Sequence, residues 1–284
     1  MNPVLLAVII VSVIGLVLGL MLAIASIVMA VPVDEKAVAI EDVLAGANCG
    51  ACGYSGCAGY ASALSKGECE DTTLCSPGGS GTAKAIASIL GVAAGDSTPM
   101  TAVVLCHGTT ENCGSVMEYH GDMSCKTASM LFSGGKACKF GCLGLGDCEA
   151  ACPYDAIHVT EGGIAEVDSV KCRACKICIN TCPKGIIELA PLYRKEAVVY
   201  CKNQDKGGDT RKACSVGCIG CMKCQKTCPH DAIHVTNFVA HVDQANCVGC
   251  GACVEGCPTH CLEMAQFGKI IVRGASDVKP VKAS

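Results

Sequence analysis

Eight cysteines towards the C-terminal end of the chain are spaced in two runs that could bind metal. In each run three cysteines recur every third residue, and a fourth follows four residues later and precedes a proline. The runs are Cys218, Cys221, Cys224 and Cys228 before Pro229, and Cys247, Cys250, Cys253 and Cys257 before Pro258. This spacing is typical of proteins with two [4Fe-4S] clusters, in which the fourth cysteine of each run ligates the neighbouring cluster. We therefore predict one cluster on Cys218, Cys221, Cys224 and Cys257, and another on Cys228, Cys247, Cys250 and Cys253.

Zinc and disulfides fit these cysteines less well. A zinc ion would use two separated Cys-x2-Cys pairs and would leave the third cysteine of each run spare. A disulfide scaffold is typical of short secreted chains and predicts scattered spacings. With 284 residues, 27 cysteines, no Trp and four Phe, the chain needs a core that is partly inorganic. Its reduced thiols favour a cytosolic location.

An earlier segment repeats the same pattern. Residues 152–160 (CPYDAIHVT) recur as residues 228–236 (CPHDAIHVT), which indicates an internal duplication. The first copy departs from the second at Leu145, which stands where the second copy has Cys221. Cys138 lies just upstream and is the natural substitute. We expect one cluster on Cys138, Cys142, Cys148 and Cys182, and its partner on Cys152, Cys172, Cys175 and Cys178.

A glycine-rich loop nearer the N-terminus predicts a separate cluster. It contains Cys49, Cys52 and Cys57, and Cys75 follows after a predicted helix over residues 58–64. Glycines between these cysteines would let the backbone pass close to a cluster. We assign this [4Fe-4S] cluster to Cys49, Cys52, Cys57 and Cys75. Cys69 is a rival fourth ligand, but its acidic neighbours would disfavour another thiolate.

Five clusters use 20 of the thiols and leave seven over. Cys261 occupies the place of Ile186 in the first copy, so we interpret it as a small core residue. A sixth cluster remains open, with ligands drawn from Cys106, Cys113, Cys125, Cys201 and Cys214.

The elements that must position these thiols suggest an α+β protein behind a membrane anchor. Residues 4–31 contain no charged side chain and exceed the roughly 20 residues that span a bilayer as a helix. A cleavable signal peptide would carry a basic start, and no Lys or Arg precedes Lys36. We therefore predict a single-pass protein of the plasma or inner membrane, with its iron-sulfur domains on the cytoplasmic side.

The predicted architecture is one transmembrane helix, a small helical [4Fe-4S] domain and two tandem ferredoxin-like 2[4Fe-4S] modules. Short strands over residues 157–160 and 164–167 form the hairpin of the first module. The predicted boundaries are 1–32 for the anchor, 33–92 for the small domain, 93–101 for a linker, 102–192 and 193–267 for the two modules, and 268–284 for a tail.

Charge is unevenly distributed although the net charge is only −4. Residues 171–226 carry 12 Lys or Arg against four acidic residues, whereas residues 34–75 carry seven acidic and two basic residues. The cations could simply offset the charge of the clusters. Alternatively, they could steer a small acidic redox carrier to the surface, with docking at Lys202, Lys206, Arg211 and Lys212. No phosphate-binding loop, hydrolytic triad or nucleic-acid motif is present, so we predict no catalytic residue in this chain.

Together these motifs resemble a known family. The strings CGACGYSGC from Cys49, CSPGG from Cys75, CLGLGDCEAACP from Cys142 and CPTHC from Cys257 are similar to those of the B subunit of the Rnf complex. That complex is an ion-translocating ferredoxin:NAD oxidoreductase, and the duplicated modules resemble the long form of this subunit. Nearly the whole chain is covered, and CGACGYSGC is the most specific element.

The resemblance implies a redox subunit of a multi-subunit translocase. Such a subunit accepts electrons from reduced ferredoxin, or flavodoxin, and passes them to other subunits of the complex, which carry the NAD and flavin chemistry. Two other functions stay open. One is a polyferredoxin subunit of a different membrane oxidoreductase, such as a hydrogenase, and the other is a non-redox structural metalloprotein.

Overall fold

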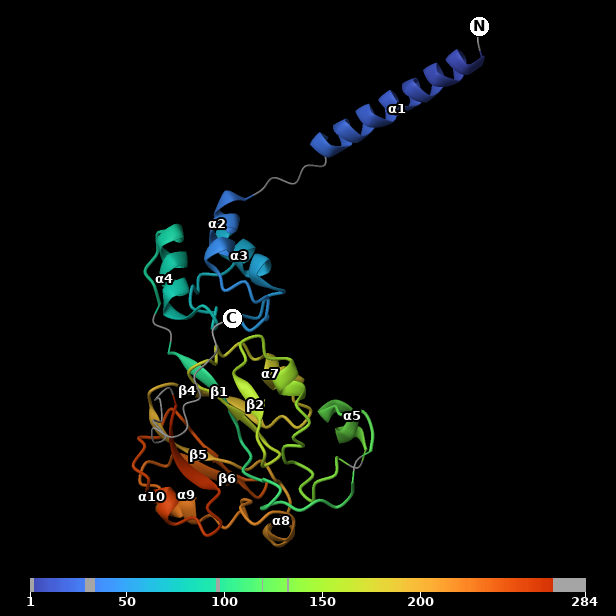
Figure 1. Cartoon of the computed structure of the whole chain (residues 1–284). Coiled ribbons are helices and arrows are strands. Elements are labelled where there is room, and N and C mark those ends of the chain that lie inside the picture. The colour runs from blue at the N-terminus through green and yellow to red at the C-terminus, as the bar shows by residue number, and fades with distance from the viewer. Residues whose placement is uncertain (1–2, 29–33, 96–97, 119, 132, 268–284) are drawn as a thin grey trace, which may run out of the picture.

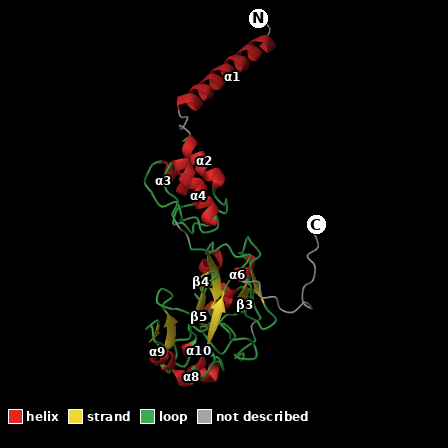
Figure 2. Ribbon diagram, turned by 90° about the vertical axis from the view of Figure 1, so that its left-hand side faces the viewer, coloured by secondary structure: helices red, strands yellow, loops and turns green. Residues whose placement is uncertain are grey.

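The computed structural model describes residues 3–28, 34–95, 98–118, 120–131 and 133–267. The predicted tail, 268–284, lies outside these residues. The chain forms a long N-terminal helix, a small helical lobe and a larger lobe of short helices and strand pairs (Figure 1). Figure 2 shows the same succession from the side.

The N-terminal helix is α1, Pro3–Val28, and it stands apart from both lobes (Figure 1). At about 1.5 Å per residue its 26 residues extend about 39 Å, which exceeds the roughly 30 Å of a hydrocarbon core. The stretch Ile9–Ser26 within it has no part buried against the rest of the chain. By length and composition α1 can therefore cross a membrane.

The small lobe packs three helices around a compact apolar core. These helices are α2 (Glu35–Val43), α3 (Cys57–Ser65) and α4 (Gly79–Leu90). The carboxylate of Asp34 caps α2 by accepting bonds from the backbone N–H groups of Lys36 and Ala37, at 3.0 and 3.3 Å. Apolar side chains from all three helices fill the centre, namely Ile40, Leu44, Tyr60, Leu64 and Ile86. The lobe presents the loop between α2 and α3 towards the larger lobe.

The larger lobe begins with seven elements. They are β1 (Met100–Val104), α5 (Cys125–Met130), α6 (Asp147–Ala150), β2 (Ile157–Val159), β3 (Ala165–Val167), α7 (Ile177–Thr181) and β4 (Ile187–Pro191). β2 and β3 form the expected antiparallel hairpin, and β1 pairs antiparallel with β4. β1 begins at Met100, inside the segment predicted as a linker.

Seven further elements follow in the same order of type. They are β5 (Lys195–Val199), α8 (Gly207–Ala213), α9 (Lys223–Thr227), β6 (Ile233–Thr236), β7 (Val239–Val242), α10 (Ala252–Glu255) and β8 (Leu262–Gln266). β6 pairs with β7 and β5 with β8, both antiparallel. The two halves meet through Val103, Leu105, Ala190 and Val198, which form one buried cluster. In this contact Val103, Leu105 and Ala190 of the first half pack against Val198 of the second half.

Sulfur replaces much of the usual aliphatic core. Within the described residues, the two largest buried clusters each contain several cysteines beside residues such as Ile157, Ile186 and Ile233. Thiols buried at this density suit groups that bind an inorganic core.

Candidate iron-sulfur sites

The loop of the small lobe brings four of the predicted ligands around one cavity. Cys49, Cys52, Cys57 and Cys75 all line it, together with Leu44 and Tyr60. The side chain of Asn48 holds the loop by accepting a bond of 2.8 Å from the backbone N–H of Cys57, at the start of α3. Cys69 does not line this cavity, and its thiol lies 3.6 Å from the carbonyl of Asp71.

A second cavity collects Cys152, Cys172, Cys175 and Cys178, the set expected from the sequence, with Tyr154 beside them. Backbone N–H groups point at two of these sulfurs. Ala102 donates to Cys172 at 3.3 Å, and Ala156 donates to Cys152 at 3.4 Å. Burial, and then the charges of the other three thiols, raise the pKa of Cys178 to about 12. Iron bound among the four sulfurs would offset this repulsion and so favour their deprotonation.

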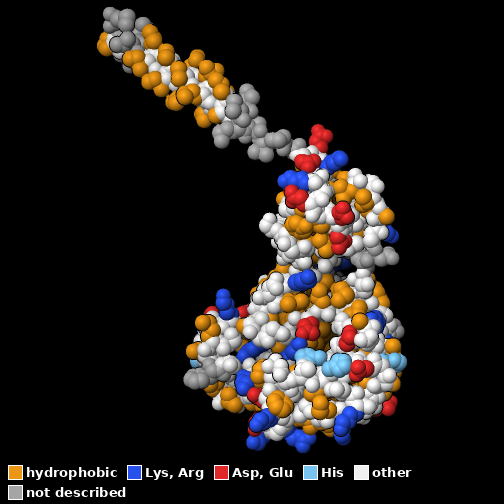
Figure 3. All heavy atoms as spheres, turned by 180° about the vertical axis from the view of Figure 1, so that it is seen from behind, with side chains coloured by type: hydrophobic (Ala, Val, Ile, Leu, Met, Phe, Trp, Pro, Cys, Tyr) orange, Lys and Arg blue, Asp and Glu red, His pale blue; other side chains and the backbone are white. Residues whose placement is uncertain are grey.

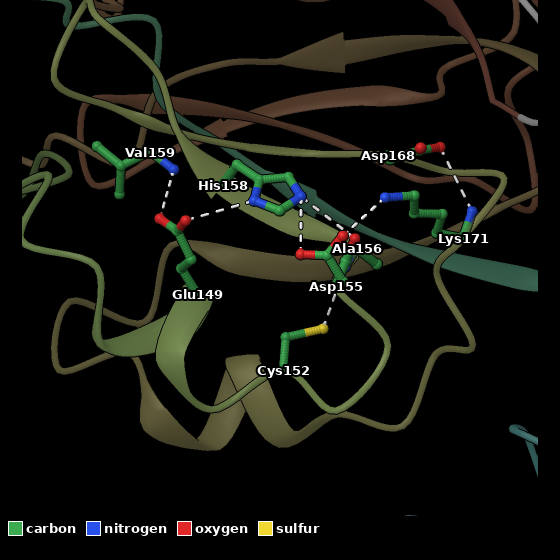
Figure 4. Close-up of polar contacts among 8 residues, drawn as sticks. All are labelled: Glu149, Cys152, Asp155, Ala156, His158, Val159, Asp168 and Lys171. Carbon is green, nitrogen blue, oxygen red and sulfur yellow. Dashed lines mark hydrogen bonds and ion pairs between the residues drawn. The ribbon is translucent and has the colours of Figure 1, made fainter. Parts of the chain in front are cut away.

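The loop that carries Cys152 is braced by polar contacts rather than by a ligand histidine. His158 lies between Glu149 and Asp155, with its Nδ1 3.3 Å from Glu149 Oε1 and its Nε2 3.2 Å from the carbonyl of Asp155 (Figure 4). Lys171 Nζ contacts the Asp155 carboxylate at 2.8 Å. His158 is therefore a structural residue at the surface.

The third cavity differs from the sequence-based expectation at one ligand. It is lined by Cys125, Cys142, Cys148 and Cys182, and not by Cys138. Burial, followed by the charges of Cys142, Cys125 and Cys182, raises the pKa of Cys148 to about 12. The predicted ligand Cys138 therefore does not fit this geometry. Cys138 was predicted because it is the nearest upstream cysteine in the sequence. In the structure the chain folds back at α5, and Cys125, its first residue, completes the cavity.

Asp147 explains how Cys125 reaches this place. Its carboxylate accepts bonds from the backbone N–H groups of Cys125 and Lys126, at 2.9 and 3.0 Å, and from the Ser124 hydroxyl at 3.0 Å. These bonds hold the start of α5 against α6. The backbone of Leu145, which stands where the second half has a ligand cysteine, lies beside the Cys125 thiol. No local spacing in the sequence could have revealed this arrangement.

The second half of the larger lobe holds two further quartets. Cys218, Cys221, Cys224 and Cys257 line one cavity, which also contacts the buried Cys261. The Sγ atoms of Cys257 and Cys261 lie 3.7 Å apart. In the other quartet, burial and then the charges of Cys228, Cys247 and Cys250 raise the pKa of Cys253. The structure thus brings together both sets of thiols expected from the sequence.

These arrangements suit clusters better than single ions. No group of three or more His, Cys, Asp or Glu side chains in the described ranges is close enough to hold one metal ion. A tetrahedral zinc site would require such a group. Four quartets that each line a cavity, and a fifth whose thiols lie close together, instead fit the larger volume of a [4Fe-4S] core.

Exposure differs sharply among the 27 thiols. Cys221 and Cys250 are exposed, and every other cysteine is buried or partly buried. Two exposed apolar residues are near them in the sequence: Met222 follows Cys221, and Val248 precedes Cys250 by two residues. The second half of the lobe therefore brings two quartets to the surface.

The four basic residues predicted to dock a carrier differ in exposure and in ion pairing. Lys202 is partly buried and forms an ion pair with Glu188, so its charge is already compensated. Lys206, Arg211 and Lys212 are exposed on or beside α8, where Lys212 Nζ lies 3.5 Å from Asp209. Lys and Arg side chains gather at the end of the larger lobe away from α1 (Figure 3).

Comparison with known proteins identifies the cluster segments. A family model for a 4Fe-4S dicluster domain matches residues 214–264, and a model for a putative Fe-S cluster matches residues 44–77. The sequence is 42% identical over 243 residues to the B subunit of the Na⁺-translocating ferredoxin:NAD⁺ oxidoreductase complex of Acetobacterium woodii, covering 86% of this chain and 72% of that protein.

Two further relatives share this level of similarity. The B subunit of the proton-translocating ferredoxin:NAD⁺ oxidoreductase complex of Clostridium ljungdahlii is 39% identical over 245 residues, covering 86% of each chain. The B subunit of the ion-translocating oxidoreductase complex of Methanosarcina acetivorans is 39% identical over 230 residues, covering 81% of this chain and 86% of that protein. Each match covers most of the chain and not only its ferredoxin-like parts.

Proposed function

Because the chain belongs to the B-subunit family of the Rnf complex, an ion-translocating ferredoxin:NAD oxidoreductase, we propose that it accepts electrons from reduced ferredoxin and relays them towards the other subunits. Bound [4Fe-4S] clusters would supply one-electron transfer at low potential. The chain's own contribution is to hold the thiol quartets, exclude water from most of them and place them in series. The family names favour this function over a hydrogenase-linked polyferredoxin.

The observation that supports this proposal most strongly is that successive thiol quartets lie next to one another along the molecule. At one end, the small lobe touches the first half of the larger lobe, where Lys176 Nζ donates to the carbonyl of Ala51 at 3.3 Å. Tyr154 lines the cavity of the Cys175 quartet, and burial followed by the charges of Cys175 and Cys49 raises its pKa, so Cys49 of the loop quartet lies close by. The loop quartet and the Cys175 quartet are therefore neighbours.

The two halves of the larger lobe are also joined through sulfur. Cys106 accepts a bond of 3.4 Å from the N–H of Cys142, and Cys201 lies close to Cys218. Cys138 lies near both Cys106 and Cys201. This supports an order that runs from the exposed quartets of the second half, through the first half, to the small lobe beside the membrane helix.

We assign electron entry to the surface around Cys221 and Cys250. These are the exposed thiols, exposed Met222 follows Cys221 directly, and exposed Val248 precedes Cys250 by two residues. The exposed cations of α8 lie on the same half of the lobe and would attract an acidic carrier. Such an arrangement combines a long-range electrostatic attraction with a small apolar contact.

Charge reversal tests this proposal directly. In stopped-flow measurements of reduction by ferredoxin, we expect the triple variant Lys206→Glu, Arg211→Glu, Lys212→Glu to lower the second-order rate about tenfold at low salt. The rate of the unmodified protein should fall as ionic strength rises, and that of the variant should depend less on salt. Lys66→Glu, on the small lobe, is the matched control and should change little. A rate that changes neither with ionic strength nor in the triple variant would refute the docking site.

We also propose that α1 anchors the chain as a single membrane span with both lobes on the cytoplasmic side. The exposed, uncharged surface of α1 and the reduced thiols of both lobes support this orientation.

A further inference from the structure

Lys176 lies where the small lobe meets the larger lobe. We propose that Lys176 is a positioning residue for electron transfer between the lobes. It joins the loop of the Cys49 quartet to the quartet of Cys175 and places a positive charge between them. The inference rests on the proposed function, because it concerns one step of the same relay.

The place of Lys176 in the chain makes it a bridge between two quartets. It follows Cys175 directly and precedes Cys178 by two residues, at the start of α7. Its Nζ donates a bond of 3.3 Å to the carbonyl of Ala51, which precedes Cys52 directly. The bond is partly buried. One side chain therefore connects the ligand loops of both quartets.

The two quartets influence each other electrostatically at this junction. Burial raises the pKa of Cys175, and the charge of Cys49 in the other lobe raises it further. The charge of Arg173 lowers the pKa of Tyr154, against the larger effects of burial and of the thiols, so a second cation lies at the junction. Reduced clusters on both quartets would repel each other, and cations between them would weaken that repulsion.

The second half of the larger lobe has the same loop without these cations. Cys250 is the counterpart of Cys175 and is exposed, whereas Cys175 is only 7% exposed. Gly251 stands where the first half has Lys176, and a valine stands where it has Arg173. The cations are thus present in the copy that the small lobe contacts and absent from the copy that faces solvent. Their presence follows the lobe contact and not the thiol pattern, which both copies share.

The backbone at Lys176 suits glycine better than lysine. Its φ is 62°, in the left-handed region, and Gly251 has φ of 83° at the same place in the second half. A Cβ is unfavourable in this region, so a glycine would be the more stable residue here. Unfavourable backbone of this kind is concentrated where a side chain serves function. At Lys176 that side chain makes the contact with Ala51.

Hydrogen exchange of the full chain, purified anaerobically with its clusters, tests the junction. Lys176→Glu and Lys176→Gly both remove the bond to Ala51, and Lys176→Gly also relieves the left-handed backbone. We expect amides within residues 47–54 to exchange about tenfold faster in both variants, as the loss of one charged hydrogen bond predicts. Lys176→Arg should keep most of the protection, because a guanidinium can also donate to the carbonyl. Lys84→Glu, at an exposed position of α4, is the control and should exchange like the unmodified protein.

Electron paramagnetic resonance of the same samples, reduced with titanium(III) citrate, gives a second readout. In the unmodified chain the signal of the small-lobe cluster should be broadened by its neighbour. In Lys176→Glu the added negative charge repels both quartets, so a sharp component of about one spin per chain should appear. Lys176→Gly should retain its iron and should not lower the unfolding midpoint, because its backbone is relaxed.

Unchanged exchange and unchanged spectra in Lys176→Glu and Lys176→Gly would overturn the inference. Loss of about four irons in Lys176→Gly would overturn it as well, because Lys176 would then support its own quartet and not the junction. Neither readout uses ferredoxin. Failure of ferredoxin to reduce the unmodified chain would therefore refute the proposed function without altering the result for Lys176.

Discussion

At the scale of single residues, Asp147 decides which cysteine completes the cluster near Leu145. Its carboxylate binds the start of α5 through three donors, and desolvation is outweighed by those bonds, so the pKa of Asp147 stays below its ordinary value. An ionised Asp147 can accept all three bonds at neutral pH. The position of Cys125 therefore depends on a residue that is itself no ligand.

Pairs of substitutions test whether Cys125 and Cys148 share a cluster. Cys125→Ser should remove about four irons, and Cys125→Ser with Cys148→Ser should remove no more, because both thiols line the same cavity. Cys172→Ser with Cys148→Ser should remove about eight, because these residues line different cavities. Anaerobic iron analysis gives the counts. Full retention of iron in Cys125→Ser would show that the cavity is not the ligand site.

Glu196 is a second residue with a measurable consequence. Its carboxyl group is fully buried, and both oxygens lack a partner among the described residues. Burial raises its pKa above the ordinary 4.5. At low pH the group is protonated in both the folded and unfolded states, whereas above the raised pKa the folded state must ionise a buried acid. The carboxyl group therefore destabilises the fold increasingly as the pH rises.

We predict that Glu196→Met raises the thermal unfolding midpoint at pH 8 and has a smaller effect at pH 5. An unsatisfied buried polar group costs about 1–3 kcal/mol, which sets the expected size at the higher pH. Glu161→Met, at an exposed turn, is the control and should show no such pH dependence. Equal midpoints for Glu196→Met and the unmodified protein at pH 8 would mean that the carboxylate is solvated or paired.

At the scale of elements, short helices and tight turns do most of the positioning. Gly144 lies between Cys142 and α6 with φ of 71°, and a Cβ there would collide with the carbonyl of Gly163 in the β2–β3 turn. Its counterpart in the second half, Gly220, has φ of 63° and faces Phe238 of the β6–β7 turn. Each glycine lets the cysteine loop pack against its hairpin.

Gly144→Ala should therefore displace the loop and release about four irons from the cavity of Cys142 and Cys148. The left-handed backbone alone costs a non-glycine residue about 1–2 kcal/mol, and the collision adds to this. Gly185→Ala is the matched control, since Gly185 has φ of 58° with open space around it. We expect Gly185→Ala to lower the unfolding midpoint slightly and to keep its iron. Equal iron contents for the two variants would mean that the turn does not constrain the cluster.

A feature could be predicted from the sequence when the residues that determine it are close together along the chain. The grouping of thiols in adjacent runs could be predicted, because three thiols every third residue converge through local backbone geometry. The hairpin at Ile157–Val159 and Ala165–Val167 was predictable for the same reason. Cys125 and Cys138 could not be placed, because their positions depend on contacts with Asp147 and with Asn203 of the second half. The pairing of Lys202 with Glu188 likewise appears only in three dimensions.

At the scale of the whole molecule, one exposed apolar helix is joined to two lobes. Leu16 and Leu20 of α1 are 72% and 59% exposed, which in water would be unfavourable. A bilayer would remove this surface from water.

We predict that Leu16→Arg with Leu20→Arg moves the chain from the membrane fraction to the soluble fraction when it is produced without the other subunits. Each arginine at the centre of a span costs about 2.5–3.5 kcal/mol on the insertion scale. Val92→Arg, at an exposed apolar residue of the small lobe, should leave the protein in the membrane fraction. Retention of the double variant after a carbonate wash would show that α1 is not the anchor.

The series of neighbouring quartets is tested most directly by electron paramagnetic resonance of the fully reduced, anaerobically purified chain. If the quartets bind clusters in the order inferred from their contacts, each reduced cluster has a paramagnetic neighbour, and the spectrum should be broadened by spin coupling throughout. Sharp signals from magnetically isolated clusters would contradict the relay.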